Sequence, residues 1–264
     1  MPRRTPRGLL FLALGLLLPG AGCSPQKQNA LLVGMELNYP PFEMIDSEGR
    51  PSGISADMAE ALGKYLHREV LIENIPFDGL IPALKTRKID LIISSMTETA
   101  ERATSIAFSD PYLRTGLCLL VNHRANIRSI EQADQPGCTI AVKQGTTGQL
   151  YAQSHLQLAR VLVLEKEDAC VLEVVQGKAQ AFIYDQMSVF SHWQRHADST
   201  EGLLKQFQEE DWAIGLRQGD TGLQEQVNAF LKSFRSEGGF NRLGDKYLKA
   251  QKEAFRQLGV AFDF

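Results

Sequence analysis

Three short segments of the chain carry side chains that together suit a small zwitterion, a molecule with one carboxylate and one ammonium group. Residues 39–42 (Tyr-Pro-Pro-Phe) offer aromatic rings, and residues 107–112 add two more. Residues 92–102 offer hydroxyl groups followed by an arginine. A planar guanidinium can contact both oxygens of a carboxylate at once. The pattern predicts a site that holds its ligand by stacking, hydrogen bonds and a two-pronged arginine contact.

Arg102 is the natural carboxylate ligand in this pattern. It follows Thr97-Glu98-Thr99, which we interpret as a first helical turn whose free N–H groups also favour an anion. On residue type alone, a solvated arginine on a polar helix would be the commoner interpretation. The preceding Ser-Ser-Met-Thr run has the same spacing to the arginine as in the family that this chain resembles, and that resemblance favours the binding role instead.

Asp185 is the second charged group with a telling position. It ends the apolar run 181–184, which we interpret as a strand, and ligands of open α/β sheets lie at the carboxyl ends of the strands. In isolation the same aspartate could equally cap a helix that follows Gln186.

The elements that must position these residues alternate between strand and helix. Apolar runs at 31–35, 70–72, 89–93, 117–121, 139–142, 161–164 and 181–184 predict strands. Apolar residues recur at helical spacing over 58–66 and 77–84, and again over 168–175 and 227–234. Such alternation predicts an α/β fold with parallel sheets covered by helices.

The N-terminal residues are typical of a secretory signal peptide rather than of a fold. Three arginines precede the ten apolar residues 9–18, which are too few to span a bilayer. Small residues then lead to Cys23, where bacterial lipoproteins carry their acylated cysteine. We expect a signal peptide over residues 1–22 and a lipid anchor on Cys23, with ordinary cleavage to a free periplasmic protein as the alternative.

Charge and motifs exclude several classes of protein. Loss of the three signal-peptide arginines leaves 25 Lys and Arg against 31 Asp and Glu, a net charge of −6. An acidic chain without a basic stripe is a poor candidate for nucleic-acid binding. No Walker loop, dinucleotide-binding glycine pattern, HExxH or GxSxG is present. His192 and His196 could hold a metal at their helical spacing, but a solvated helix face is the commoner case, so we predict neither metal nor cofactor.

These segments resemble the extracytoplasmic solute-binding proteins that deliver polar amino acids to ABC importers, from about residue 31 to about residue 250. The resemblance implies two α/β lobes joined by two crossover segments, at about 113–121 and 211–217. It places residues 31–114 and 216–264 in the first lobe and residues 118–212 in the second. It also implies a monomer outside the cytoplasm that binds a free amino acid and docks on an inner-membrane permease.

The resemblance further implies a role for each site residue. Arg102 would bind the ligand carboxylate, helped by the loop of Thr146 and Thr147, and Asp185 would receive the α-ammonium. Tyr39 and Phe77 would sandwich the ligand side chain. The remaining hydrogen bonds to the ammonium and the side chain would come from Ser94, Ser95 and Thr97.

The choice of ligand depends on Glu36 and Lys143. Glu36 stands where members that bind basic side chains carry an acid, whereas a lysine at position 143 resembles the glutamine-binding branch. A buried ammonium near a cationic ligand would weaken binding. We therefore predict a polar amino acid, with glutamine slightly ahead of arginine, and cystine remains open.

One departure from the family and two alternative functions remain. After Gly53 the usual aromatic-acid pair is replaced by Ile54-Ser55-Ala56, so we expect the first-lobe wall to pack differently. The scaffold also hosts periplasmic cyclohexadienyl dehydratases, for which Glu36 or Asp185 would be the general acid. A ligand sensor for a membrane receptor would share every binding residue.

Overall fold

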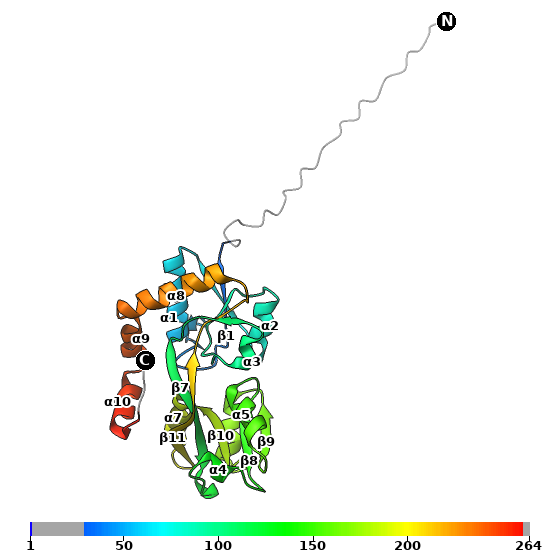
Figure 1. Ribbon diagram of the computed structural model, residues 1–264, viewed down its shortest axis with the longest axis vertical. Helices are drawn as coiled ribbons and strands as arrows, with labels where there is room; N and C mark the ends of the chain where they lie inside the picture. The colour runs from blue at the N-terminus through cyan, green and yellow to red at the C-terminus, as the bar shows by residue number, and fades with distance from the viewer. Residues whose placement is uncertain (2–28, 261–264) are drawn as a thin grey trace.

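The computed structural model describes residue 1 and residues 29–260 (Figure 1). The expected signal peptide, apart from Met1, and the predicted lipidation site Cys23 lie outside the described residues. Residues 29–260 form two α/β lobes, one above the other in Figure 1, each built around its own five-stranded sheet.

The first lobe contains the sheet with strand order β4-β1-β5-β12-β6. Its strands are Leu31–Met35 (β1), Val70–Asn74 (β4), Leu91–Ile92 (β5), Ala107–Phe108 (β6) and Gly215–Leu216 (β12). A separate hairpin pairs Met44–Ile45 (β2) with Pro51–Ser52 (β3). The helices are Ile54–Leu66 (α1), Phe77–Gly79 (η2, a 3-10 turn), Leu80–Lys85 (α2), Ala100–Ala103 (α3), Thr221–Ser236 (α8) and Gly239–Tyr247 (α9).

Strand β1 is apolar along its whole length because helices cover both of its faces. Val33 and Met35 belong to the same buried cluster as α1, whereas Leu32 packs with the cluster of α2. At Gly34 a side chain would meet Ile89 at 2.4 Å, so glycine allows α2 and its neighbours to pack closely on the strand. Burial on both faces therefore explains why residues 31–35 form a continuous apolar run.

The second lobe contains the sheet with strand order β11-β7-β10-β8-β9. Its strands are Leu113–Asn122 (β7), Thr139–Lys143 (β8), Arg160–Leu164 (β9), Ala181–Asp185 (β10) and Thr200–Trp212 (β11). The helices are His123–Ala125 (η3, a 3-10 turn), Ile130–Ala133 (α4), Thr147–His155 (α5), Glu167–Val175 (α6) and Gln186–Arg195 (α7).

The parallel pairing predicted from the alternation of strands and helices is found in both sheets, but each sheet also contains antiparallel strands. Strand β12 runs antiparallel to β5 and β6, and β7 runs antiparallel to both β10 and β11. The chain leaves the first lobe along β7 and returns to it along β11. Because β11 runs back toward the first lobe, it pairs antiparallel with β7, and β12, which follows it, pairs antiparallel with β5 and β6.

Strands β7 and β11 form an antiparallel ribbon that extends from the second lobe toward the first (Figure 1). The pairing runs from Thr200 opposite Asn122 to Trp212 opposite Leu113, with an irregularity between Leu203 and Gln208. An isolated bridge then joins Trp212 to Thr97 in the first lobe. The two lobes are therefore linked by paired strands rather than by a flexible linker.

The last helix, Lys249–Leu258 (α10), reaches from the first lobe to the second. Phe255 on α10 is 1% exposed and packs edge-on against Phe190 of α7, with ring centroids 4.7 Å apart. Figure 1 shows α10 (red) beside the second lobe.

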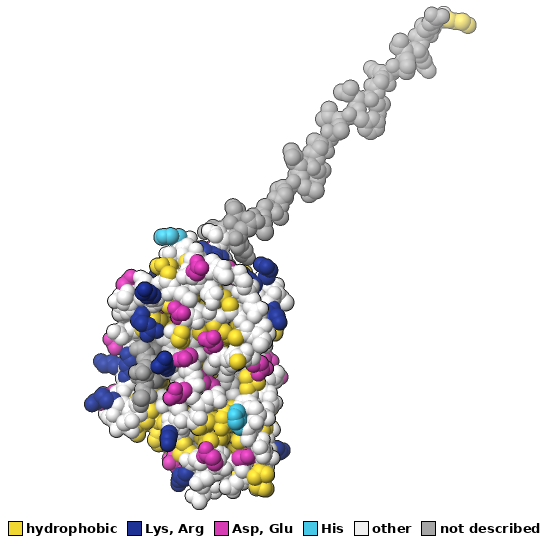
Figure 2. All heavy atoms as spheres, in the orientation of Figure 1, with side chains coloured by type: hydrophobic (Ala, Val, Ile, Leu, Met, Phe, Trp, Pro, Cys, Tyr) yellow, Lys and Arg dark blue, Asp and Glu magenta, His cyan; other side chains and the backbone are white. Residues whose placement is uncertain are grey.

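The surface shows no concentration of one charge on the face drawn in Figure 2, where basic and acidic side chains are interspersed. Among the described helices, none combines the length and the apolar character needed to cross a membrane.

Candidate ligand-binding site

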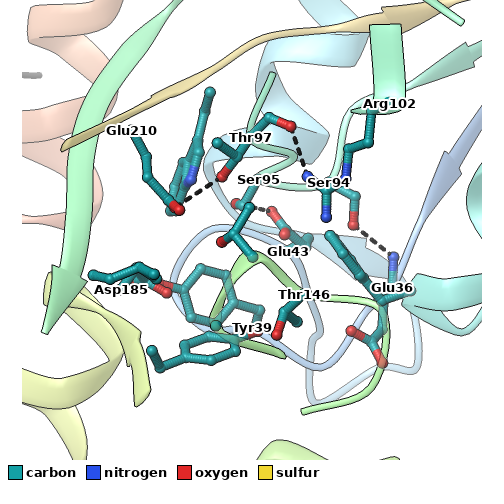
Figure 3. A pocket seen from close by; sticks show the side chains of 16 residues that line it. Glu36, Tyr39, Glu43, Ser94, Ser95, Thr97, Arg102, Thr146, Asp185 and Glu210 are labelled. Atoms are coloured by element: carbon teal, nitrogen blue, oxygen red, sulfur yellow. Dashed lines mark hydrogen bonds between the residues drawn. The ribbon is translucent and has the colours of Figure 1, made fainter. Parts of the chain in front are cut away.

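A pocket lies between the two lobes, where the loops that follow β1, β5 and β8 meet the crossing strands (Figure 3). The empty space beside its lining atoms, including space that is open solvent, is about 440 Å³. The lining residues are Glu36, Tyr39, Glu43, Phe77, Ser94, Ser95, Thr97, Arg102, Leu117, Thr146, Thr147, Gly148, Tyr184, Asp185, Glu210 and Trp212.

The structure brings the residues singled out in the sequence to this one place. Ten of them line the pocket: Glu36, Tyr39, Phe77, Ser94, Ser95, Thr97, Arg102, Thr146, Thr147 and Asp185. Lys143 is the eleventh, and its ammonium forms an ion pair with Glu36. The predicted residues brought together in this way are up to 149 positions apart in the chain, from Glu36 to Asp185.

Arg102 is a buried cation without a carboxylate within ion-pair distance among the described residues, and it is only 7% exposed. Thr99 caps the short helix α3 by accepting a hydrogen bond from the Arg102 amide at 3.1 Å. The guanidinium donates to the Thr97 carbonyl at 2.6 Å and to the Gly145 carbonyl at 2.9 Å. Burial lowers the pKa of Arg102, and the charges of Glu210 and Glu101 oppose that shift. A guanidinium held in this way favours an incoming anion.

Asp185 is both the last residue of β10 and the N-cap of α7. Its Oδ1 accepts hydrogen bonds from the amides of Met187 and Ser188, and from the Tyr39 hydroxyl at 2.6 Å. Oδ2 takes no hydrogen bond from the described residues and is open for another donor. Burial raises the pKa of Asp185 to about 7, against the hydrogen bond from Tyr39. A cationic ligand group at Oδ2 would favour the ionised form.

The loop of Thr146 and Thr147 meets the first lobe closely. Thr146 caps α5 by accepting from the Gln149 amide, and its hydroxyl donates to the Lys143 carbonyl at 2.7 Å. Gly145 has a φ of +76°, and a side chain there would lie 3.0 Å from Cβ of Asp78 in the first lobe. Glycine therefore permits the turn and the close approach of the two lobes.

Hydrogen-bonded and ionic contacts close the pocket from opposite lobes. They include Tyr39 with Asp185, Arg102 with Gly145, Lys143 with Glu36, Thr97 with Glu210 at 3.0 Å, and Gln144 with Asp78 at 2.8 Å. The lobes are thus in a closed arrangement in which residues of both face the same cavity.

Aromatic rings form one wall of the pocket. Tyr39 stacks on Phe42 with ring centroids 5.4 Å apart, and Trp212 packs edge-on against both rings at 6.1 and 5.0 Å. Tyr184 approaches Tyr39 at 6.2 Å. On the other side, the Phe77 ring lies 5.5 Å from both the Arg102 guanidinium and the Lys143 ammonium. Tyr184 and Trp212 were not predicted as site residues, because aromatic residues in strands are usually core.

Glu36 contacts its neighbours through both its backbone and its side chain. Its backbone amide donates to Ser94 Oγ at 2.9 Å, and its carboxylate forms the ion pair with Lys143, which is 2% exposed. The side chains of Glu36 and Lys143, on which the predicted choice of ligand depends, therefore meet beside the pocket.

Glu43 is a buried acid that the sequence analysis did not identify. Its Oε2 accepts hydrogen bonds from Ser55 at 2.6 Å and Ser95 at 3.1 Å. Burial raises its pKa to about 8, opposed by these two hydrogen bonds. Ser55 can approach because Gly53 adopts a φ of +111°, where any side chain would meet the Phe42 carbonyl at 2.4 Å. Ser55, which belongs to the departure Ile54-Ser55-Ala56, thus contributes a hydrogen bond to this wall of the pocket.

Glu210 on β11 is the second acid that was missed. Its Oε2 accepts from Thr97 at 3.0 Å and its Oε1 accepts from Gln208 at 3.1 Å. Burial raises its pKa, while the hydrogen bonds from Thr147 and Thr97 and the charge of Arg102 lower it. The polar sequence around Glu210 gave no sign of burial, because it belongs to a strand rich in glutamate and glutamine.

The two histidines considered for a metal lie elsewhere, on and just after α7. His192 is 3% exposed and its Nε2 is 2.7 Å from Oε1 of Glu167, which also accepts from Ser188. His196 follows the end of α7. Within the described residues no group of three or more potential metal ligands occurs.

Comparison with known proteins identifies relatives over most of the chain. The chain is 30% identical to the L-arginine-binding protein of Pseudomonas aeruginosa over 225 residues, covering 81% of this chain and 86% of the relative. Its fold matches an ancestral amino acid-binding protein, described as a precursor of cyclohexadienyl dehydratase, with a TM-score of 0.78 and 33% identity. That match covers 85% of this chain and 97% of the other.

A second solved structure is a putative binding component of an ABC transporter from Wolinella succinogenes, complexed with lysine. It has a TM-score of 0.78 and 29% identity, and the match covers 84% of this chain and 97% of that one. The family model of the bacterial extracellular solute-binding proteins matches residues 31–250. The chain therefore belongs to family 3 of the bacterial extracellular solute-binding proteins.

Proposed function

We propose that this protein binds one free polar amino acid between its lobes and presents it to an ABC importer. The observation that carries the proposal is the pairing of two opposite charges across one pocket. Arg102 is buried without an ion-pair partner among the described residues, and Asp185 has an open carboxylate oxygen. An α-amino acid supplies one carboxylate and one ammonium for these two groups, so neither charge is buried uncompensated.

The wall between these charges suits the rest of an amino acid. Thr97, Ser94 and the loop of Thr146 and Thr147 supply polar groups, and Tyr39, Trp212 and Phe77 supply apolar surface. A ligand that contacts Arg102 in one lobe and Asp185 in the other stabilises the closed form over an open one. Closure is the signal that an importer could recognise.

The names of the relatives support a polar ligand, since they are described as binding arginine or in complex with lysine. The family also supports a location outside the cytoplasm. A lipid anchor on Cys23 and a monomeric state belong to the same proposal. Mass spectrometry of the wild-type protein isolated from its native membrane tests the anchor. The Cys23→Ala variant is the control.

Isothermal titration of the purified protein against the twenty common amino acids tests the binding function. We expect one or a few polar amino acids to bind with a stoichiometry of one, and apolar ones to bind at least tenfold more weakly. Tighter binding of leucine than of any polar ligand, or no binding at all, would refute the proposal.

Binding without catalysis is the form of the proposal that the site favours. Arg102 and Asp185 provide a partner for each charge of an amino acid head group. Glu36, a candidate general acid, forms an ion pair with Lys143. Incubation with prephenate or arogenate followed by chromatography of the products provides the check. We expect no turnover, and formation of an aromatic product would show a dehydratase instead.

A further inference from the structure

A chain of hydrogen bonds continues from Asp185 into the second lobe, beyond the pocket. The amide of Ser188 donates to Asp185 Oδ1 at 3.1 Å, and the hydroxyl of Ser188 donates to Glu167 Oε1. The same Oε1 lies 2.7 Å from Nε2 of His192, whose Nδ1 lies 3.3 Å from the guanidinium of the exposed Arg195. Glu167, Ser188 and His192 are buried, and none of the three lines the pocket.

The partners of His192 fix the direction of its hydrogen bonds. An arginine side chain can only donate, so Nδ1 of His192 accepts from Arg195 and the ring hydrogen lies on Nε2. Nε2 therefore donates to Glu167, the first residue of α6. Ser188 and His192 are four residues apart on α7, so they lie on one face of that helix. Glu167 thus holds the first two turns of α7 through its Oε1.

Glu167 is satisfied at only one of its two oxygens. Oε2 is buried and has no hydrogen-bond partner among the described residues. Burial of a carboxylate with an unsatisfied oxygen is costly, so the contacts at Oε1 are the physical reason for an acid at this position. Those contacts hold the start of α7, and the first amides of α7 bind Asp185.

The start of α7 determines where the Asp185 carboxylate points. Asp185 is the N-cap of α7, and its Oδ1 accepts from the amides of Met187 and Ser188. Tyr39 donates to the same Oδ1, so Oδ2 is the oxygen left for the ligand. A displacement of α7 would move both amides and turn Oδ2 away from the ligand.

We propose that Glu167 is a positioning residue of the ammonium site: through Ser188 and His192 it holds the start of α7, and with it Asp185, where the α-ammonium of the ligand binds. The inference rests on the proposed function and adds to it a residue that does not touch the ligand. Ligand affinity then depends on a side chain outside the pocket.

The charge of Glu167 gives this role a measurable effect on the pH profile of binding. Burial is the main cause that raises the pKa of Asp185 to about 7, and the charge of Glu167 adds to it. An ammonium favours the ionised carboxylate, so ionisation of Asp185 should raise ligand affinity about tenfold between pH 6 and pH 8. Without the charge of Glu167 the pKa of Asp185 is lower, and the rise becomes smaller.

The titratable groups around these two carboxylates come from the loop after β1 and from β7, β10, β11, α6 and α7. Those that face Asp185 are Tyr39, Cys118, Glu167, Tyr184 and Glu210. Those that face Glu167 are Tyr39, Cys170, Tyr184, Asp185 and His192. Burial raises the pKa of each tyrosine and cysteine in these sets, so they stay neutral up to pH 8. Glu43, whose pKa is about 8, also lines the pocket but is common to all variants.

Glu167→Gln removes the charge and keeps the contacts. The amide oxygen can accept from Ser188 and His192, and the NH₂ group takes the place of the unpartnered Oε2. The probe is the amino acid that binds the wild type most tightly among the twenty common ones, titrated by calorimetry at pH 6, 7 and 8. We expect the ratio of affinity at pH 8 to that at pH 6 to fall from about tenfold to about fourfold or less. A purely structural role of Glu167 would leave this ratio unchanged.

Variants that remove the contacts test the positioning itself. Glu167→Ala should lose about tenfold or more in affinity at pH 8, where Asp185 is ionised in the free protein. Ser188→Ala and His192→Leu remove one hydrogen bond each and should lose about three- to tenfold. His192→Gln offers a donor that does not titrate, so it should recover most of the loss seen in His192→Leu and keep the wild-type pH profile. His196→Gln, just after α7 and outside the chain of hydrogen bonds, is the control and should bind as the wild type does.

The result that would overturn the inference is an affinity of Glu167→Ala within twofold of the wild type at pH 8, or a pH profile of Glu167→Gln that matches the wild type. Thermal unfolding above the titration temperature shows that each variant is folded. Where Glu167→Ala does not fold, Ser188→Ala takes its place, and an unchanged affinity there has the same meaning. Unchanged variants of a wild type that binds an amino acid end this inference alone, whereas a wild type that binds none of the twenty ends the proposed function as well.

Discussion

The Tyr39 hydroxyl donates a 2.6 Å hydrogen bond to Asp185 Oδ1, and this contact joins the two lobes through the wall of the pocket. Tyr39 lies on the loop after β1 in the first lobe, whereas Asp185 ends β10 in the second. The contact leaves Asp185 Oδ2 for the ligand and fixes the ring of Tyr39 beside Trp212. One residue therefore serves as aromatic wall and as a bridge between the lobes.

Tyr39→Phe separates these two roles. The ring remains, and only the hydrogen bond to the carboxylate is lost, which is worth about 1.5–3 kcal/mol for a charged partner. We expect ligand affinity to fall about 10- to 100-fold in titration calorimetry, and Tyr39→Leu to lose more because the stacking surface is also removed. Unchanged affinity in Tyr39→Phe would show that the bridge does not contribute to the closed form.

Arg102→Lys and Arg102→Ala test the carboxylate contact. Lysine keeps the charge and loses the planar fork, so we expect affinity to fall at least tenfold for all ligands. Alanine should lose about 2–5 kcal/mol of binding free energy, or about 30- to 5000-fold in affinity. Thermal unfolding of the free protein should stay near that of the wild type, since removal of a buried unpaired cation relieves a desolvation cost. Near-native affinity in the alanine variant would contradict the assignment.

The stability of the free protein should depend on pH through Glu43. Its pKa is about 8 in the folded protein and near 4.5 in the unfolded chain, so the folded state binds more protons between these values. The contribution of Glu43 to the free energy of unfolding is fully present below about pH 4.5. It decreases as the pH rises to 8, by at most ~1.4 kcal/mol per pH unit. Denaturant unfolding at pH 5.5, 7 and 8.5 measures the free energy of unfolding.

Glu43→Gln is the matched control for that measurement. The wild-type free energy of unfolding minus that of the variant should decrease from pH 5.5 to 8.5, while Asp185, whose pKa is about 7, contributes equally to both proteins. A difference that stays constant over this range would mean that Glu43 is not desolvated in the folded protein.

Phe255→Ala tests the contact between α10 and the second lobe. The buried ring packs against Phe190, and truncation of a buried phenylalanine typically costs about 3–5 kcal/mol. We expect a lower thermal unfolding midpoint, a smaller loss in Phe255→Leu, and a loss in Phe190→Ala that is not additive with Phe255→Ala. Full additivity of the two alanine variants would show that the rings do not stabilise each other.

Several elements could be predicted because their sequence signals are local. Strand β1 was predicted at its observed bounds, since a strand covered on both faces must be apolar at every position. The helix predicted over residues 58–66 lies within α1, whose buried apolar positions face the core. For Asp185 the sequence offered two interpretations, a helix cap and a group at the ligand-binding end of a strand. The carboxylate caps α7 and also lines the pocket.

Strand β11 and the two buried acids were not predicted, and the reason is long-range packing. Strand β11 is rich in charged and amide side chains, so it has no apolar run, and its place is set by pairing with β7. Glu210 lies in a polar stretch of the sequence, and Glu43 is a lone acid between apolar residues of a proline-containing loop. An acid at either kind of position is normally exposed. Their burial depends on Ser55, Ser95 and Thr97, which reach them only after the lobe has folded.

A crystal structure of the protein with bound L-arginine tests the central claim most directly. We expect the carboxylate of the ligand within about 3 Å of the Arg102 guanidinium and its α-ammonium within about 3 Å of Asp185 Oδ2, with the lobes closed. A ligand that contacts only one lobe, or whose head group lies away from both residues, would contradict the claim that the two lobes share one amino acid.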